Sequence, residues 1–160
     1  MIAEIFRLLA IIMISWLLGL LMADFLRRRQ YYGIANFRII GSNTRYSFIG
    51  IGAFKWIVTK TFYRHLNQNI KLSATPTLDE CTEVRKAMTH SEWLHRIAFW
   101  LVVTIGIPIT LVQGLYRQVV PLLLLNVILN LYPVLLQQYN KRRLDKVILG
   151  VKKHQLAALR

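Results

Sequence analysis

The chain has little of several features that define common protein classes. Its 160 residues include one cysteine, Cys81, so no internal disulfide and no four-cysteine metal site can form. Acidic residues are also scarce, with 7 Asp and Glu against 21 Lys and Arg, which gives a formal net charge of +14. There is no Gly-rich phosphate loop, no redox motif, no nucleotide-binding fingerprint and no internal repeat. The composition also excludes disorder, a collagen-like fibre and a disulfide-rich scaffold.

The histidines do not form a metal-binding pattern. There are 4 of them, and the two nearest in sequence, His90 and His95, are five residues apart. That spacing does not stack two side chains on one face of a helix. We therefore expect neither a bound metal nor a resident cofactor.

Apolar residues are what the sequence has in quantity. The chain is 55% hydrophobic, with a mean hydropathy of +0.41. These residues gather in three runs, close to the roughly 20 residues that a helix needs to cross a bilayer. We predict spans at about 4–25, 94–113 and 119–137. The first run lacks a basic region before it and a cleavage site after it, and Arg27–Arg29 follow it, so we interpret it as a retained anchor.

The basic residues are separated from the apolar runs, and their placement predicts the orientation. Eleven Lys and Arg lie between the first and second spans, seven follow the third, and the turn between the second and third has only Arg117. The positive-inside rule places the N-terminus outside and both segment 26–93 and tail 138–160 in the cytoplasm. The charge then reflects topology and attraction to anionic lipid. Nucleic-acid binding is the competing interpretation, but no recognition motif accompanies the charge.

The fold class expected is an all-α membrane protein forming a single integral membrane domain, residues 1–160. Residues 46–63 are apolar with interrupting lysines, which indicates an interfacial or re-entrant element rather than a further span. Thr77 with Glu80 matches a capping box, so a helix should begin near residue 77 and continue into the second span. Pro108 should kink that span. The tail should form a basic amphipathic helix on the membrane surface.

Polar residues within the spans are costly and usually face protein or a cavity. Glu92 and His95 are three residues apart and share a helix face where the second span meets the cytoplasm. At about 100° per residue, one stripe of amide side chains follows a single face of the third span and its continuation. That stripe consists of Asn126, Asn130, Gln137 and Asn140.

Counting along the two last spans predicts which residues share a depth. If the turn between them is centred near residue 116, equal counts place His95 level with Gln137 in an antiparallel pair. Asn67 and Asn69 belong to an interfacial patch that should lie near the same level. We therefore expect one polar cluster at the inner membrane surface, drawn from three segments of the chain.

This cluster suits acyl transfer to a hydroxyl. His95 is the candidate general base, and Glu92 is the candidate group that orients it. Nearby amide and Arg donors could stabilise an oxyanion, and the basic run that follows the third span could hold a phosphate-bearing donor such as coenzyme A. The substrate-binding candidates from this argument are Asn67, Asn69, Asn126, Asn130, Gln137, Asn140, Arg142 and Arg143.

Structural interpretations of the same residues stay open. Glu92 and His95 would then only end a span, and the amide stripe would be hydrogen-bonding glue between helices. The protein would be a non-catalytic membrane subunit whose polar stripe packs against partner helices. A lipid transporter would need a continuous path across the bilayer, for which three spans leave little room in a monomer.

Three short segments resemble one family of membrane enzymes, the glycosyl-4,4'-diaponeurosporenoate acyltransferases of staphyloxanthin-type carotenoids. Asn126–Leu144 resembles the C-terminal pattern of that family, Ser91–His95 is similar to its Ala-Glu-x-x-His element, and Leu66–Ile70 is similar to a further segment. The Arg that usually follows the Gln of the C-terminal pattern is missing here: Gln138 is followed directly by Tyr139, unless Gln137 takes the Gln position. The residues that fit this pattern are Asn130, Pro133, Gln138, Tyr139, Asn140, Arg143 and Leu144.

The resemblance implies a membrane acyltransferase with a lipid-borne acceptor, either a carotenoid glycoside or another glycolipid. The donor would be acyl-CoA or another acyl thioester, acting as a co-substrate. The resemblance also adds Gln138 and Tyr139 to the substrate-binding candidates. The expected partners are membrane lipids, the acyl donor and the acceptor, with a homo-oligomer left open and no nucleic acid. The expected location is the bacterial inner membrane, as a multi-pass protein.

Overall fold

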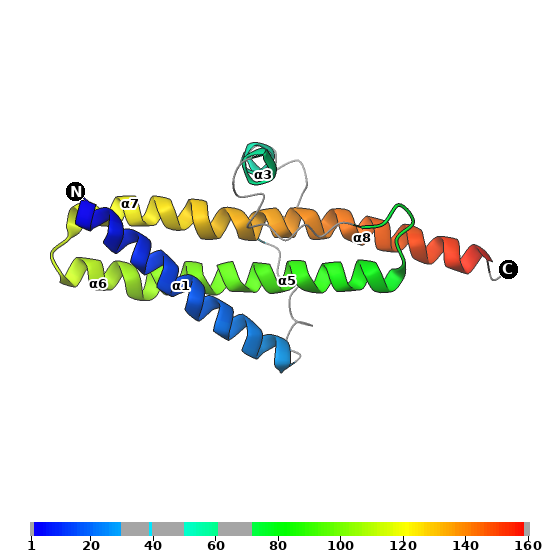
Figure 1. Ribbon diagram of the computed structural model, residues 1–160, viewed down its shortest axis with the longest axis horizontal. Helices are drawn as coiled ribbons and strands as arrows, with labels where there is room; N and C mark the ends of the chain where they lie inside the picture. Colours follow the sequence, from blue (N-terminus) through cyan, green and yellow to red (C-terminus); the bar gives the residue numbers. More distant parts are fainter. Residues whose placement is uncertain (1, 30–38, 40–49, 61–71, 159–160) are drawn as a thin grey trace. The chain divides into compact units, whose positions relative to one another are not determined.

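The computed structural model describes residues 2–29, 39, 50–60 and 72–158, which are helical apart from short turns and contain no strand (Figure 1). This confirms the all-α class. The elements in chain order are α1 (Ile2–Arg28), α3 (Ile51–Lys60), α5 (Leu78–Leu101), η2 (Val102–Gly106), α6 (Ile107–Val112), α7 (Tyr116–Asn126), η3 (Val127–Leu131) and α8 (Tyr132–Ala158).

Within the described residues, three helical stretches are long and apolar enough to cross a membrane. They are Ile2–Arg28, Leu78–Val112 and Tyr116–Ala157. Each overlaps one of the runs from which we predicted a span, so the expectation of about three transmembrane helices is confirmed. The helix α3 lies inside segment 46–63, the rest of which falls largely outside the described residues.

Both of the longer spans contain a π-helical segment close before a proline. The segment η2 precedes Pro108, and η3 precedes Pro133. Because proline has no N–H, the carbonyl four residues earlier loses its α-helical partner. A π turn is a common way to accommodate such a defect within a helix. Before Pro108, where we expected a kink, the backbone forms the π turn Val102–Gly106, and the chain continues as α6.

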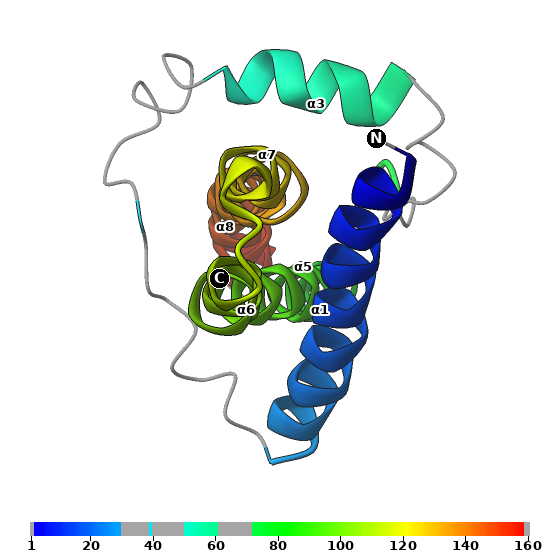
Figure 2. The ribbon, with the colours of Figure 1, turned by 90° about the vertical axis from the view of Figure 1, so that its left-hand side faces the viewer.

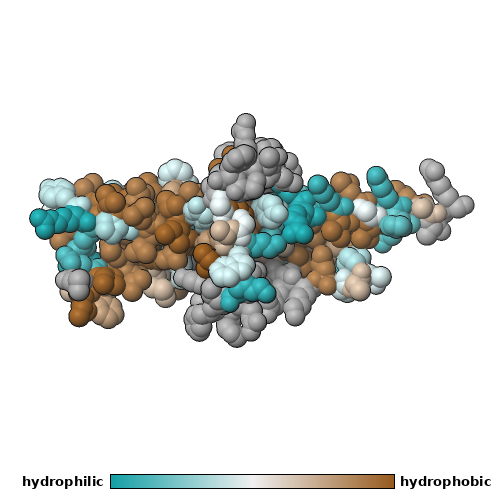
Figure 3. Space-filling view, turned by 90° about the horizontal axis from the view of Figure 1, so that it is seen from above, coloured by the Kyte–Doolittle hydropathy of each residue, from teal (hydrophilic) through white to brown (hydrophobic). Residues whose placement is uncertain are grey.

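The described chain divides into two compact units. The first comprises residues 1–36 and 90–134, and the second comprises residues 37–89 and 135–160. In the first unit, α1 crosses obliquely over α5 and α6 (Figures 1 and 2). Its core joins Leu8 and Ile12 of α1 to Val102 and Leu122. Hydrophobic residues also gather on the surface over α7, as expected for a lipid-facing helix (Figure 3).

Gly19 allows α1 to approach α5 closely. A Cβ at this position would lie 2.7 Å from the Leu94 carbonyl oxygen and 3.4 Å from Ala98 Cβ. Small residues at such crossings are the usual means of close packing between membrane helices. The sequence of the first span therefore specifies where α1 rests on α5.

Gly19→Ala should lower the free energy of unfolding by about 1–3 kcal/mol, because the added methyl group meets backbone rather than a flexible side chain. Gly150→Ala is the matched control, since a Cβ at Gly150 would meet nothing within 4 Å. That control should be neutral or stabilising, by up to about 1 kcal/mol, through helix propensity. Thermal unfolding of both variants in detergent tests this, and a shift of the same sign in both would contradict the packing argument.

The second unit has its own small core between the first half of α5 and the middle of α8. Cys81, Val84 and Leu144 are buried together, with Met88 and Ile148 packed against them. We expected Leu144 and Ile148 to belong to a tail helix lying on the membrane surface. Both side chains pack on α5, and the tail helix α8 continues the helical stretch of the third span.

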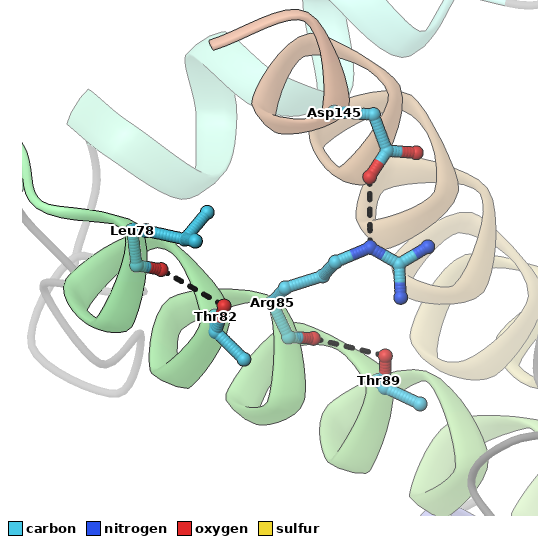
Figure 4. A network of polar contacts seen from close by, with 5 residues as sticks. All are labelled: Leu78, Thr82, Arg85, Thr89 and Asp145. Carbon is cyan, nitrogen blue, oxygen red and sulfur yellow. Dashed lines mark hydrogen bonds and ion pairs between the residues drawn. The ribbon is translucent and has the colours of Figure 1, made fainter. Parts of the chain in front are cut away.

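An ion pair joins the same two helices. Arg85 Nε lies 2.7 Å from Asp145 Oδ1, and both side chains are about one-third exposed (Figure 4). On α5 itself, the Thr82 and Thr89 hydroxyls donate back to the carbonyls of Leu78 and Arg85. A partly exposed pair of this kind contributes about 0.2–1 kcal/mol, so its main effect is to fix which residues of the two helices face each other.

The start of α5 follows its capping signal. Thr77 Oγ1 accepts a hydrogen bond of 3.1 Å from the Glu80 N–H. The Glu80 carboxylate in turn accepts from both the hydroxyl and the N–H of Ser73, at 2.7 Å each. These bonds from Ser73 hold the pKa of Glu80 below its ordinary value. The prediction that a helix begins near residue 77 is confirmed, since α5 begins at Leu78.

Candidate active site

A row of hydrogen-bonded side chains crosses the first unit from α1 to α5. Trp16 Nε1 donates to Asn130 Oδ1 at 2.8 Å, and Asn130 Nδ2 donates to Asn126 Oδ1 at 2.8 Å. Asn126 Nδ2 then donates to the Phe99 carbonyl at 3.2 Å. Both asparagine side chains are fully buried, at 0% exposure. Two buried amides in a membrane helix are costly, and this row supplies partners for both.

The chemistry of the two ends fixes the direction of the row. An indole N–H can only donate, and a backbone carbonyl can only accept. The oxygen of Asn130 must therefore face Trp16, and the NH₂ of Asn126 must face Phe99. Both ends require the same orientation of the two amides, which removes the usual ambiguity between the oxygen and nitrogen of an asparagine side chain.

His95 contacts this row at the oxygen of Asn130. Its Nδ1 lies 3.3 Å from Asn130 Oδ1. Because that oxygen can only accept, Nδ1 must carry a proton. In the neutral imidazole the lone pair is then on Nε2, so Nε2 is the nitrogen that can accept a proton. The row therefore selects one tautomer of His95.

One further neighbour limits the orientation of the imidazole. The Trp16 indole meets it edge to face, with ring centroids 6.0 Å apart and planes at 89°. The imidazole is therefore held both by the hydrogen-bonded row and by an aromatic ring from α1.

Glu92 does not take the position that we expected beside His95. It is buried, at 2% exposure, and forms an ion pair with Arg96 one turn further along α5. The Arg96 guanidinium also lies 5.1 Å from the centre of the Trp93 ring. The group on Nδ1 of His95 is Asn130, which reaches it from another helix. The spacing of three residues placed Glu92 on the same helix face as His95. It could not show that Asn130 reaches His95 Nδ1 from another helix.

The count that paired His95 with Gln137 was also wrong. His95 contacts Asn130, and Phe99 one turn later contacts Asn126, so the two helices face each other about seven residues earlier than expected. The main reason is the turn, which we centred near residue 116. The helix α6 ends at Val112 and α7 begins at Tyr116, so the turn lies before that residue.

The amide stripe does not stay on one buried helix face past η3. Asn126 and Asn130 are buried, but further along the helix the buried polar side chains are Gln138 and Lys141. Gln137 and Asn140 are half-buried. A π turn holds more residues than an α turn, so residues after η3 are rotated relative to a regular helix. The prediction of a stripe at 100° per residue fails beyond Leu131 for this reason.

The remaining candidates on α8 belong to the second unit. Gln138 Oε1 accepts a hydrogen bond of 3.1 Å from the Ile39 N–H. Two cations approach the Tyr139 ring, with Lys55 Nζ of α3 at 6.0 Å and Arg143 Cζ at 5.9 Å from its centre. Arg142 is half-buried. Asn67 and Asn69 lie outside the described residues, so their predicted role stays a prediction.

Trp16 is the residue of the site that the sequence argument missed. Its nearest polar partner, Asn130, is 114 residues away, so no local spacing connects them. The available signal was chemical: an indole N–H in the middle of an apolar run needs an acceptor, and the third span offered buried amides. Among the described residues, no group of three His, Cys, Asp or Glu side chains is placed to hold a metal ion.

A histidine held in one orientation among membrane helices is typical of a functional site. Comparison with known families identifies an acyltransferase. The family described as glycosyl-4,4'-diaponeurosporenoate acyltransferase matches residues 28–149, well over half of the chain. The protein therefore belongs to this family of membrane enzymes, which acylate a carotenoid glycoside. No curated protein and no solved structure matches the chain.

Proposed function

We propose that this enzyme transfers a fatty acyl group from a thioester donor to a hydroxyl of a lipid-borne glycoside, with His95 as the general base. The observation that carries the proposal is the 3.3 Å contact between His95 Nδ1 and Asn130 Oδ1, which leaves Nε2 as the basic nitrogen. An acceptor dissolved in the bilayer and a base on a membrane helix can meet without the acceptor leaving the membrane. Glycosyl-4,4'-diaponeurosporenoate is the acceptor that the family name indicates.

The proposed reaction needs one base and no metal. His95 Nε2 takes the proton of the acceptor hydroxyl as its oxygen attacks the thioester carbonyl carbon. The tetrahedral oxyanion then collapses, the carbon–sulfur bond breaks, and the leaving thiolate takes the proton from His95. The products are an ester and a thiol, and the imidazole returns to its starting state.

The structure changes the roles we propose for the amide side chains. Asn126 and Asn130 use their NH₂ groups within the row, so we assign them to positioning His95 rather than to binding an oxyanion. Contacts to substrate or oxyanion are assigned to Gln137, Gln138, Tyr139 and Asn140, and contacts to donor phosphates to Arg142 and Arg143. Glu92 is assigned to holding Arg96.

We further propose that the donor arrives from the cytoplasm. The support is the distribution of charge: the segment before the second span and the tail after the third carry most of the basic residues. By the positive-inside rule both face the cytoplasm, which is also where coenzyme A thioesters are made.

The test is an assay of the purified protein in lipid nanodiscs with radiolabelled palmitoyl-CoA. Labelled ester should form with glycosyl-4,4'-diaponeurosporenoate and not with the same carotenoid lacking its sugar. Free palmitate should give no product, because carboxylate is not an activated acyl group. If no thioester supports ester formation and a second membrane protein co-purifies stably with this one, the non-catalytic subunit becomes the better interpretation.

A further inference from the structure

The helix α1 lies almost wholly outside the segment that matches the family, residues 28–149, yet it supplies a contact to the site. We propose that Trp16 is a positioning residue of the active site: its indole N–H holds the Asn130 oxygen toward His95, and its ring holds the imidazole plane. This inference rests on the proposed role of His95. It makes α1 a part of the catalytic apparatus as well as a membrane anchor.

The first observation is the hydrogen bond. Trp16 Nε1 lies 2.8 Å from Asn130 Oδ1, closer than His95 Nδ1 at 3.3 Å. Because the indole cannot accept, an Asn130 side chain rotated by 180° would present its NH₂ to another donor. Trp16 therefore makes the alternative orientation of Asn130 unfavourable. In that orientation the Asn130 NH₂ would face His95 Nδ1. Nδ1 would then have to accept, and the imidazole would carry its proton on Nε2.

The second observation is the ring contact. The planes of Trp16 and His95 meet at 89° with centroids 6.0 Å apart, an edge-to-face geometry. Contacts of this type between aromatic rings contribute about 0.5–1.5 kcal/mol and depend on the angle between the planes. Rotation of the imidazole about its own bond to the chain would lose this contact together with the bond to Asn130.

The third observation is that α1 is held on both sides of Trp16. One turn before it, Ile12 is buried against Val102 and Leu122. Close to one turn after it, Gly19 rests on the Leu94 carbonyl, which belongs to the residue directly before His95. The indole is therefore placed by helix packing on both sides of it. Trp100 on α5 differs, because 57% of its surface is exposed.

The experiment compares Trp16→Phe with Trp100→Phe. Phenylalanine keeps an aromatic ring and removes the N–H, and Trp100 is the matched control on an exposed face of α5. The protein is labelled with ¹⁵N in its histidine rings, purified in detergent, and the His95 signals are assigned by their loss in His95→Ala. Ring nitrogen shifts report which nitrogen carries the proton. The kcat and KM for palmitoyl-CoA and the carotenoid glycoside are measured in parallel.

We expect the wild-type protein to carry the His95 proton on Nδ1. Trp16→Phe should give a mixture of tautomers and lower kcat about 3- to 10-fold, the size expected for loss of one neutral hydrogen bond, with both KM values unchanged. Trp100→Phe should change neither quantity. A role in stability alone would lower the melting temperature and leave the tautomer as in the wild type.

Two results would overturn the inference. One is a wild-type protein in which His95 carries its proton on Nε2. This measurement uses no substituted protein, so it decides the question even if Trp16→Phe does not fold. The other is a Trp16→Phe protein with wild-type tautomer and wild-type kcat. Full activity in His95→Ala would instead overturn the proposed function, and the tautomer measurement would still decide whether Trp16 controls His95.

Discussion

His95→Ala should lower kcat by about 10²- to 10⁴-fold, the usual contribution of a general base. The substitution removes the group that we propose takes the hydroxyl proton, while the attacking oxygen and the thioester are unchanged. The KM values should change little, because the imidazole acts on the transition state more than on the bound substrates. Initial rates of ester formation in nanodiscs, at saturating and limiting concentrations of each substrate, separate the two effects.

His90→Ala is the matched control for this experiment. His90 lies on the same helix and its Nε2 is 3.7 Å from Asp24 Oδ1, an ion-pair distance on the cytoplasmic side proposed here. It has no place in the proposed reaction, so its kcat should stay within about twofold of the wild type, as for most substitutions away from the chemistry. Equal losses in the two variants would indicate that both act through packing, and His95 would lose its catalytic assignment.

The parts of this protein that the sequence predicts are those specified by neighbouring residues. Three apolar runs predict three spans because a bilayer core sets the length of a helix that crosses it. Thr77 and Glu80 predict the start of α5 because a cap satisfies N–H groups within one turn. His95 and Asn130 stand out because polar side chains in a span need partners. Their functional roles remain predictions.

The contacts that complete the site depend on long-range packing. The Trp16–Asn130 bond joins residues 114 positions apart and requires α1 to cross the other spans at one place. That place is set by Gly19 against Leu94, which no periodicity reveals. The partners of Glu92 and Gln137 were misplaced for a related reason. The π turn η3 rotates the helix face that follows it. A turn that lies a few residues earlier than expected slides one helix along its neighbour.

Asn130→Leu should lower kcat by about 100-fold, which is the effect that a displacement of about 1 Å can have on a reacting group. Leucine has a similar volume and no acceptor, so the Nδ1 proton of His95 and the indole N–H of Trp16 both lose their partner. The base would then sample the wrong tautomer and other orientations. Asn130→Asp should keep more activity than Asn130→Leu, because one carboxyl oxygen still accepts from His95 and Trp16, and the other, when protonated, donates to Asn126 in place of the lost NH₂.

Asn126→Leu distinguishes positioning from packing. It removes an equally buried amide one turn away, which also bonds to Asn130, but it leaves the acceptor that faces His95. We expect Asn126→Leu to destabilise the protein by about 1–3 kcal/mol, the cost of leaving buried groups without partners, and to reduce kcat less than Asn130→Leu does. Thermal unfolding and initial rates measured on both variants make the comparison. If the two leucine variants lose stability and kcat in the same proportion, Asn130 is hydrogen-bonding glue between helices and His95 needs no partner to act.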